Sequence, residues 1–160
     1  MTISVPVSTV PAAIAYLASA IQTQLATDSS PITVVIGEQA TDIIDQDAVQ
    51  IGEVRRLPDP MAMVGSGGQF FLEEKYDIEI LVSSFTGSTD DDGTIANSLA
   101  LTARAWQLAA YVETASRLDP SMGELVQRSY PSASASVGPE NRSNGRVCEV
   151  ALSVHVEATL

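Results

Sequence analysis

The sequence predicts an α+β fold in which a mostly antiparallel sheet carries two helices packed on one face. Two segments, 11–25 and 93–118, repeat apolar residues with helical spacing, whereas the other apolar segments are short or alternate with polar residues. The strands occur in runs, in the order α-β-β-β-α-β-β, which favours an α+β sandwich over an alternating βαβ fold. At 160 residues, the chain is expected to form a single domain over residues 1–160.

The first helix is predicted to begin near Pro11. Ser8 and Thr9 are good capping residues, and proline is tolerated in the first helical turn, where its missing N–H is not needed. An apolar stripe follows at spacings of three and four residues: Ile14, Leu17, Ile21 and Leu25. Residues 28–31 end the helix, and 32–36 form a short β-branched strand that Gly37 closes.

Residues 48–55 predict a second strand, with Val49, Ile51 and Glu53 on the same face. The segment 57–69, with two prolines and three glycines, predicts a long loop. The third strand is expected over 70–85. Its apolar face comprises Tyr76, Ile78, Ile80 and Val82, and its other face is charged, as in a half-solvated antiparallel sheet.

The second helix, over 93–118, is long for a small domain and carries two apolar stripes. The first stripe comprises Ile95, Leu99, Trp106 and Ala110, and the second comprises Leu101, Leu108, Val112 and Ala115. A helix with so much apolar circumference packs on two sides, one of them its own sheet. We interpret Trp106 as a core residue.

Residues 124–137 and 146–158 are predicted to pair as a hairpin across a loop at 138–145. The last strand alternates clearly, with Cys148, Val150, Leu152, Val154 and Val156 facing inward and His155 facing outward. Cys148 is therefore expected to be a buried apolar residue rather than a nucleophile.

Composition excludes several classes of function. Twenty acidic residues against eight basic ones give a formal net charge of -12, and the basic residues are scattered, which argues against binding nucleic acid or an anionic membrane. One cysteine excludes an internal disulfide and a CxxC zinc site. The sequence has no apolar run of about 18 residues, so no membrane span is predicted.

No motif predicts catalysis, a cofactor or a metal. The run Asp90, Asp91 and Asp92 lacks the alternate spacing of a calcium loop and is better explained by capping of the second helix. The glycines at 65–68 lack the GK[ST] ending of a phosphate loop, and the chain has no GxSxG elbow. We therefore expect a protein that is not an enzyme.

Nearly the whole chain, from about residue 11 to 160, resembles the tail terminator (minor tail) proteins of long-tailed bacteriophages, the siphoviruses. The resemblance rests on the element order, the acidic connector GEQATDIIDQD, the strand EEKYDIEILVSSF, the helix DGTIANSLALTARAWQLAAYVETASRL and the closing strands GELVQRSY and RVCEVALSVHVEATL. It implies a hexameric ring that caps the tail tube, stops its elongation and joins it to the head-side connector. Such a ring belongs to the virion, is assembled in the host cytoplasm and lets DNA pass through its lumen without binding it.

The resemblance also implies assembly roles for particular residues. The acidic candidates for the lumen or rim, where negative charge would repel passing DNA, are Asp42, Asp45, Asp47, Asp90, Asp91 and Asp92. The candidate contacts to tube or connector are Met61, Met63, Gly65, Gly67, Gly68, Pro139 and Arg142. Leu101, Leu108 and Val112, on the second stripe of the long helix, are the candidates for the subunit interface, together with the edge strands.

Three alternatives stay open at this point. A different neck component, such as a head–tail connector or tail-completion protein, has a similar size and also forms rings. A tail-tube protein is expected to be richer in strand and to lack so dominant a helix. A small acidic enzyme or ligand-binding domain is the third alternative.

Overall fold

The computed structural model describes residues 7–37, 46–57, 73–87, 95–142 and 145–160. Its elements are α1 (Val10–Leu25), β1 (Ile32–Ile36), β2 (Asp47–Leu57), β3 (Glu73–Thr86), α2 (Ile95–Leu118), β4 (Arg128–Arg142) and β5 (Gly145–Thr159). The predicted fold class and the order α-β-β-β-α-β-β are confirmed. Within these ranges, no helix combines the length and the apolar character needed to cross a bilayer.

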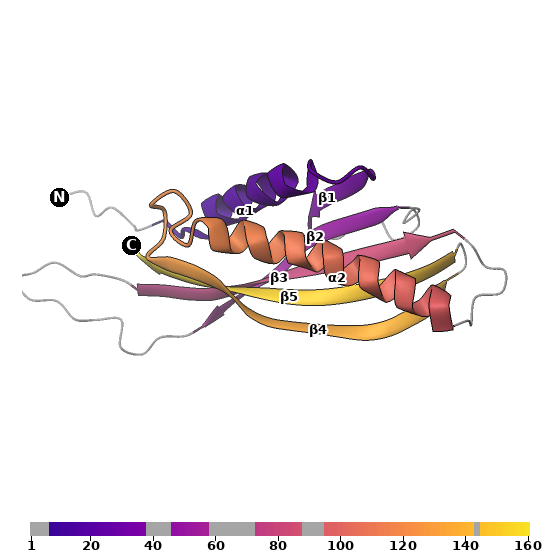
Figure 1. The fold of residues 1–160 in the computed structure, drawn as a ribbon. Coiled ribbons are helices and arrows are strands. Elements are labelled where there is room, and N and C mark those ends of the chain that lie inside the picture. Colours follow the sequence, from indigo (N-terminus) through magenta and orange to yellow (C-terminus); the bar gives the residue numbers. More distant parts are fainter. Residues whose placement is uncertain (1–6, 38–45, 58–72, 88–94, 143–144) are drawn as a thin grey trace, which may run out of the picture.

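Five strands form one sheet in the order β1-β2-β3-β5-β4 (Figure 1). The pairs β2–β3, β3–β5 and β5–β4 are antiparallel, whereas the edge strand β1 is parallel to β2. Both helices lie on the same face of the sheet (Figure 1). They contact each other and run in opposite directions. Tyr16 in α1 hydrogen-bonds Asp119, just after α2, whereas Asp28, just after α1, hydrogen-bonds Arg104 in the first half of α2.

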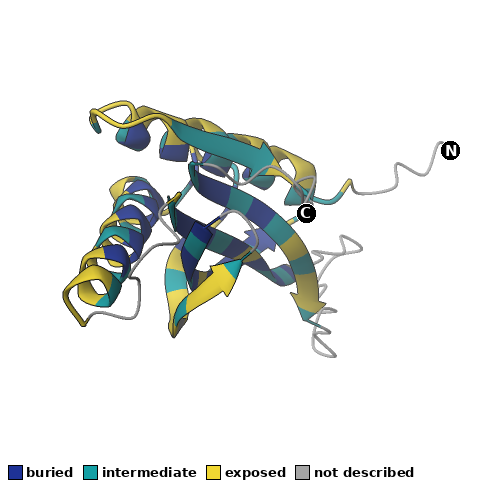
Figure 2. Cartoon of the chain, turned by 90° about the vertical axis from the view of Figure 1, so that its right-hand side faces the viewer, coloured by how far each residue is buried: buried dark blue, intermediate teal, exposed yellow. Residues whose placement is uncertain are grey.

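The core fills the space between this face and the helices. β3 contributes Tyr76, Ile78, Ile80 and Val82 at 0–1% exposure, and β5 contributes its inward residues from Cys148 to Ala158. Leu17 and Ile21 cover the core from α1. The alternation of buried and exposed residues along the strands, visible in Figure 2, follows the period of two in the sequence.

The rotation of α2 about its axis is the reverse of the prediction. The second stripe, with Leu101, Leu108 and Val112, is buried against the chain's own core. The first stripe is exposed instead, and Trp106 is 39% exposed rather than a core residue. We call this exposed stripe the α2 ridge; it comprises Ile95, Leu99, Ala103, Trp106 and Ala110.

The prediction of a loop at 138–145 is wrong, because β4 continues to Arg142. Gly138 and Pro139 lie within a register shift between Val137 and Glu140, so the strand absorbs them as an irregularity. β4 is also an edge strand, and prolines within sheets occur mainly on edge strands and at bulges. Residues 143 and 144 lie outside the described residues.

Two smaller predictions change for local reasons. A register shift between Ile51 and Val54 places Val54 opposite Ile78, so Glu53 leaves the apolar face and is exposed. The first helix begins at Val10 with Thr9 as its N-cap, but the Thr9 side chain makes no capping bond to the helix. A carboxylate from β3 occupies this end of the helix instead.

Candidate functional site

Arg104 of α2 joins three parts of the fold that are far apart in the sequence. Its Nε donates to Asp47 Oδ2 at 2.7 Å, at the start of β2. Its Nη1 and Nη2 donate to the two carboxylate oxygens of Asp28, in the turn after α1, at 2.8 and 3.1 Å. Asp28 also accepts a hydrogen bond from the Tyr111 hydroxyl. One guanidinium therefore fixes α2 against both the α1–β1 turn and β2.

The electrostatics of this network favour the charged forms of both partners. Hydrogen bonding to Arg104, helped by the Ser30 N–H, holds the pKa of Asp28 well below its usual range. The same bonds, from Asp28 first and then Asp47, raise the pKa of Arg104 against the opposing effect of burial. Asp28 and Arg104 are therefore held in their charged forms, and their charges are used within the chain.

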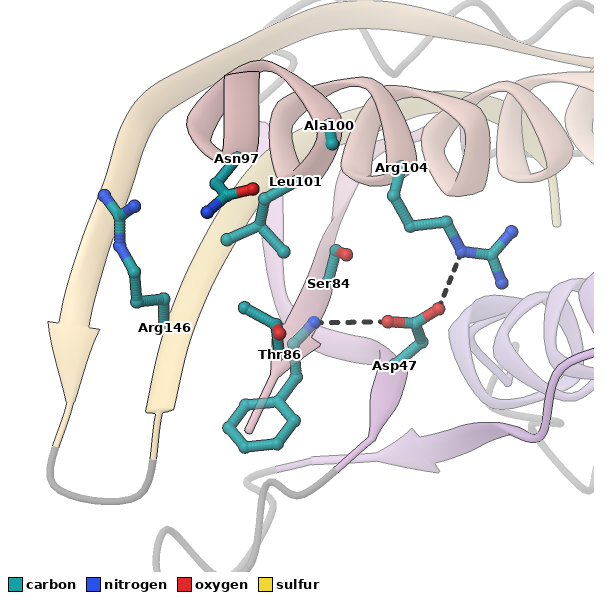
Figure 3. Close-up of a pocket in the computed structure, with 9 residues that line it drawn as sticks. Asp47, Ser84, Thr86, Asn97, Ala100, Leu101, Arg104 and Arg146 are labelled. Carbon is teal, nitrogen blue, oxygen red and sulfur yellow. Dashed lines mark hydrogen bonds and ion pairs between the residues drawn. The ribbon is translucent and has the colours of Figure 1, made fainter. Parts of the chain in front are cut away.

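A pocket of about 390 Å³ lies beside this network, between the first turns of α2 and the ends of β3 and β5 (Figure 3). Asp47 lines it and accepts the Phe85 N–H at 3.2 Å. Arg146 and Asn97 line the pocket too, and Arg146 donates to Ser98 Oγ at 3.2 Å. The Ser84 hydroxyl is buried in the lining and has no hydrogen-bond partner among the described residues.

A buried carboxylate holds the other end of α1. Glu74 is 1% exposed; it accepts the Ser8 hydroxyl at 2.6 Å, and both the N–H and the hydroxyl of Thr9 at 2.9 Å. Burial alone would raise the pKa of Glu74, but these hydrogen bonds outweigh it and lower the pKa. The adjacent Glu73 is exposed, as expected for neighbouring strand residues that point to opposite faces.

His155 lies on the outer face of the sheet, as predicted, but its side chain is only 13% exposed. Its Nδ1 is 2.7 Å from Asp77 Oδ1, and its Nε2 is 3.4 Å from Glu157 Oε1. The ring of Tyr130 lies 5.2 Å away, between centroids. Both ring nitrogens of His155 therefore face carboxylates, and no nucleophile is placed against them among the residues that the structure describes.

The predicted site residues fall in different places. Asp47 is described, and its side chain, 12% exposed and paired with Arg104, presents little free charge to a lumen. Pro139 and Arg142 lie in β4, where Arg142 donates to Glu140 and Glu149 at 2.7 and 2.8 Å. The others lie outside the described residues: Asp42, Asp45, Asp90, Asp91, Asp92, Met61, Met63, Gly65, Gly67 and Gly68.

The interface candidates need correction. Leu108 and Val112 are fully buried, and Leu101 is 7% exposed, so all three pack against the chain's own core and offer no surface to a neighbour. The apolar surface that α2 presents to solvent is the α2 ridge, where Ile95 is 79% and Leu99 63% exposed.

Sequence reasoning missed the roles of Glu74 and Arg104, although both leave a signal. Glu74 shares the parity of Tyr76 on β3, so the alternation alone places it inward, and a buried carboxylate needs hydrogen-bond donors. Arg104 is the only charged residue in the first 18 residues of α2, which marks it as a residue with a specific partner. Among the described residues, no cluster of histidine, cysteine and carboxylate side chains is arranged to hold a metal ion.

No family model and no curated protein matches the sequence. Among solved structures, the chain is similar to the PVC sheath/tube terminator of an extracellular contractile injection system in its extended state, with a TM-score of 0.48 and 14% identity. That alignment covers 98% of this chain and 58% of the terminator chain, so this chain spans little more than half of that protein. A second solved structure aligns with a TM-score of 0.41 and 14% identity over 92% of this chain and 93% of its own. At these scores neither likeness assigns a function.

Proposed function

We propose that this protein is a structural component of a phage-type tail: a tail terminator that forms a hexameric ring, caps the tail tube and joins it to the head-side connector. The proposal is supported by the resemblance of the chain to tail terminators of long-tailed phages and by the element order on which that resemblance rests. The finished ring is part of the virion, at the junction of head and tail.

The observation that carries an assembly role is the α2 ridge. Ile95, Leu99 and Trp106 lie on one side of a helix at exposures of 79%, 63% and 39%. Large apolar side chains gathered on one exposed surface mark an interaction site, whereas scattered ones do not. A protein of net charge -12 that leaves such a stripe uncovered is suited to burying it against another protein chain.

The acidic character fits the proposed path of DNA. A negative lumen repels phosphate and prevents the DNA from binding during its passage. Within the described residues, most of the charged side chains on β3 and β5 lie on the face away from the helices, and several are neutralised by pairs such as Arg128–Glu157. The aspartates at 42, 45 and 90–92 remain the lumen or rim candidates.

The function is tested by letting the particles assemble in cells that do not produce this protein and measuring tail lengths by negative-stain electron microscopy. We expect overlong tubes without heads, and restoration of a single length when the wild-type protein is supplied in trans. Tails of normal, uniform length joined to heads in its absence would exclude a terminator role. Normal tubes that fail only to join heads would favour a different neck protein.

One observation favours a second candidate function, that of a small ligand-binding domain. The pocket of about 390 Å³ is within the range of roughly 300–1,000 Å³ typical of ligand sites, and it is lined by the unpartnered Ser84 hydroxyl. Thermal-shift measurements with a panel of small polyols and carboxylates test this candidate. A shift that is present in the wild type and lost in Ser84→Ala would support it, and the absence of any shift would reject it.

A further inference from the structure

A second apolar surface lies on the side of the sheet opposite the helices. It is a groove of about 280 Å³, lined by Leu81 of β3, Ala135 and Gly138 of β4, and Val147 and Ala151 of β5, with three polar neighbours. The strand register pairs Leu81 with Ala151 and Ala151 with Ala135, so these three side chains lie in one row across the sheet. Their parity is opposite to that of the core residue Ile80, which places the row on the outer face.

The shape of the groove suits protruding side chains better than a free ligand. Ala135, Gly138 and Ala151 are small, and their lack of bulk creates the hollow beside Leu81 and Val147. The volume is below the roughly 300 Å³ at which ligand pockets usually begin. An apolar hollow of this size takes one or two large side chains from a partner.

The α2 ridge is the complementary surface on this same chain. It presents a protruding row of Ile95, Leu99 and Trp106, while the groove presents a recess of the same apolar character. The charges around the two surfaces are also complementary. The exposed side of α2 bears Arg117, whose side chain is 67% exposed, beside the less exposed Glu113, whereas Glu140 and Glu149 at the groove share a single arginine, Arg142.

We propose that the α2 ridge of one copy packs into the β3–β5–β4 groove of a second copy of this chain. The inference rests on the proposed function and deepens it, because it names the two surfaces that join neighbouring subunits of the ring. The ridge and the groove lie on opposite sides of the sheet, so the contact is heterologous. Every added copy leaves one ridge and one groove open, and only closure of a ring satisfies all of them.

The ridge is tested by Leu99→Glu, with Leu118→Glu as its matched control. Leu99 and Leu118 are 63% and 68% exposed and lie on the same helix, so each substitution removes the same side chain and adds the same charge without disturbing the core. Only Leu99 belongs to the ridge. By sedimentation velocity at added salt, which screens the repulsion between copies, we expect Leu99→Glu to weaken self-association at least about tenfold and Leu118→Glu to leave it unchanged.

The groove is tested by Ala135→Glu, with Ala133→Glu as its matched control. Both alanines are exposed on β4, and both have the parity of the outer face, opposite Ala151 and Ser153 respectively. Only Ala135 lines the groove. We expect Ala135→Glu to weaken self-association by the same factor as Leu99→Glu, and Ala133→Glu to behave as the wild type. Circular dichroism melts of all four variants establish that they are folded.

Mixing the two defective variants distinguishes the proposed geometry from a symmetric one. Leu99→Glu keeps an intact groove and Ala135→Glu keeps an intact ridge, so an equimolar mixture should form a one-to-one complex and nothing larger. A ridge-to-ridge contact predicts no complex. The proposal is overturned if the wild type stays monomeric at every salt and protein concentration. It is also overturned if a control variant weakens self-association as much as the variant it is matched to, or if the mixture gives no complex.

The outcome separates this inference from the proposed function. If self-association fails these tests while loss of the protein still gives overlong tails, the interface is wrong and the terminator role stands. If the two surfaces associate as described while tail length is unaffected, the interface stands and the terminator role is wrong.

Discussion

The Glu74 carboxylate lies at the first turn of α1, on the apolar face of the sheet, where it is 1% exposed. Its oxygens accept the Ser8 hydroxyl and both donors of Thr9, and Arg56 Nη2 lies 3.7 Å away. The residue that would ordinarily cap α1, Thr9, is thus itself held by a strand 65 residues further along the chain. A charged group is tolerated in the core because these three donors are directed at its oxygens.

Replacing Glu74 with glutamine should therefore destabilise the protein. The amide has the same shape but presents N–H groups where donors already point, and hydrogen bonds to a charged acceptor contribute about 2 kcal/mol. We expect Glu74→Gln to lower the free energy of unfolding by about that amount in urea denaturation. Glu73→Gln, at the exposed neighbouring position, should change it by less than about 0.5 kcal/mol. Equal effects at the two positions would contradict the assigned role.

Asp119 should make stability depend on acidity. Hydrogen bonds from Ser121, the Gly123 N–H and Tyr16 lower the pKa of Asp119 to about 2, from an ordinary value of 3.8. A carboxyl group with a depressed pKa stabilises the fold above its unfolded pKa, and this contribution is lost as the pH falls through the folded value. The melting temperature of the wild type should therefore exceed that of Asp119→Asn at pH 7, and the difference should vanish between about pH 4 and pH 2. A pH-independent difference would exclude this linkage.

At the scale of elements, Arg104 determines how α2 lies on the sheet. Its bonds to Asp28 and Asp47 hold one side of the helix against the α1–β1 turn and β2, with its side chain 22% exposed. The two apolar stripes of α2 are similar in composition, so hydrophobicity alone does not decide which of them faces the core. The ion pairs supply a preference that the apolar pattern lacks.

Arg104→Gln should therefore cost far more stability than loss of a surface arginine. The substitution leaves two carboxylates with little-exposed side chains, Asp28 and Asp47, without their counter-charge, and this uncompensated charge lowers the free energy of unfolding. Arg117→Gln, on the same helix, breaks an exposed i,i+4 pair with Glu113 and should cost less than about 0.5 kcal/mol. Chemical denaturation of both variants measures the contrast, and similar losses would show that the network is not a special one.

The elements differ in how far the sequence alone predicts them. β3 and β5 are recognised correctly because one face is buried and the other solvated, and this imposes a strict period of two. β4 is mispredicted between 138 and 142 because a bulge at a sheet edge accommodates Gly138 and Pro139, which otherwise signal a turn. The exposed position of Trp106 escapes prediction because it depends on the rotation of α2, which is fixed by partners 57 and 76 residues away in the sequence. The parallel pairing of β1 with β2 is not indicated by any local pattern in the sequence of either strand.

For the molecule as a whole, the dominant electrostatic quantity is the net charge of -12. Self-repulsion of this charge opposes the compact state, and salt screens it by shortening the Debye length from about 30 Å at 0.01 M to about 8 Å at 0.15 M. The melting temperature at pH 7 should rise over this range of sodium chloride. The rise should shrink near pH 4, where about half of the free carboxylates are protonated. A fall with salt at pH 7 would mean that ion pairs outweigh repulsion in this fold.

The position of β5 in the sheet has a consequence for how the protein is made. β5 is the last strand in the chain, yet it lies inside the sheet, between β3 and β4. While the chain emerges from the ribosome, β3 can pair with β2 but not with β5 until residues 145–159 are available. Helix α2 packs against β3, β4 and β5 together, so it too lacks a complete surface until then. Folding is completed only after this strand is released, and a nascent chain stalled before residue 145 should remain open to proteases.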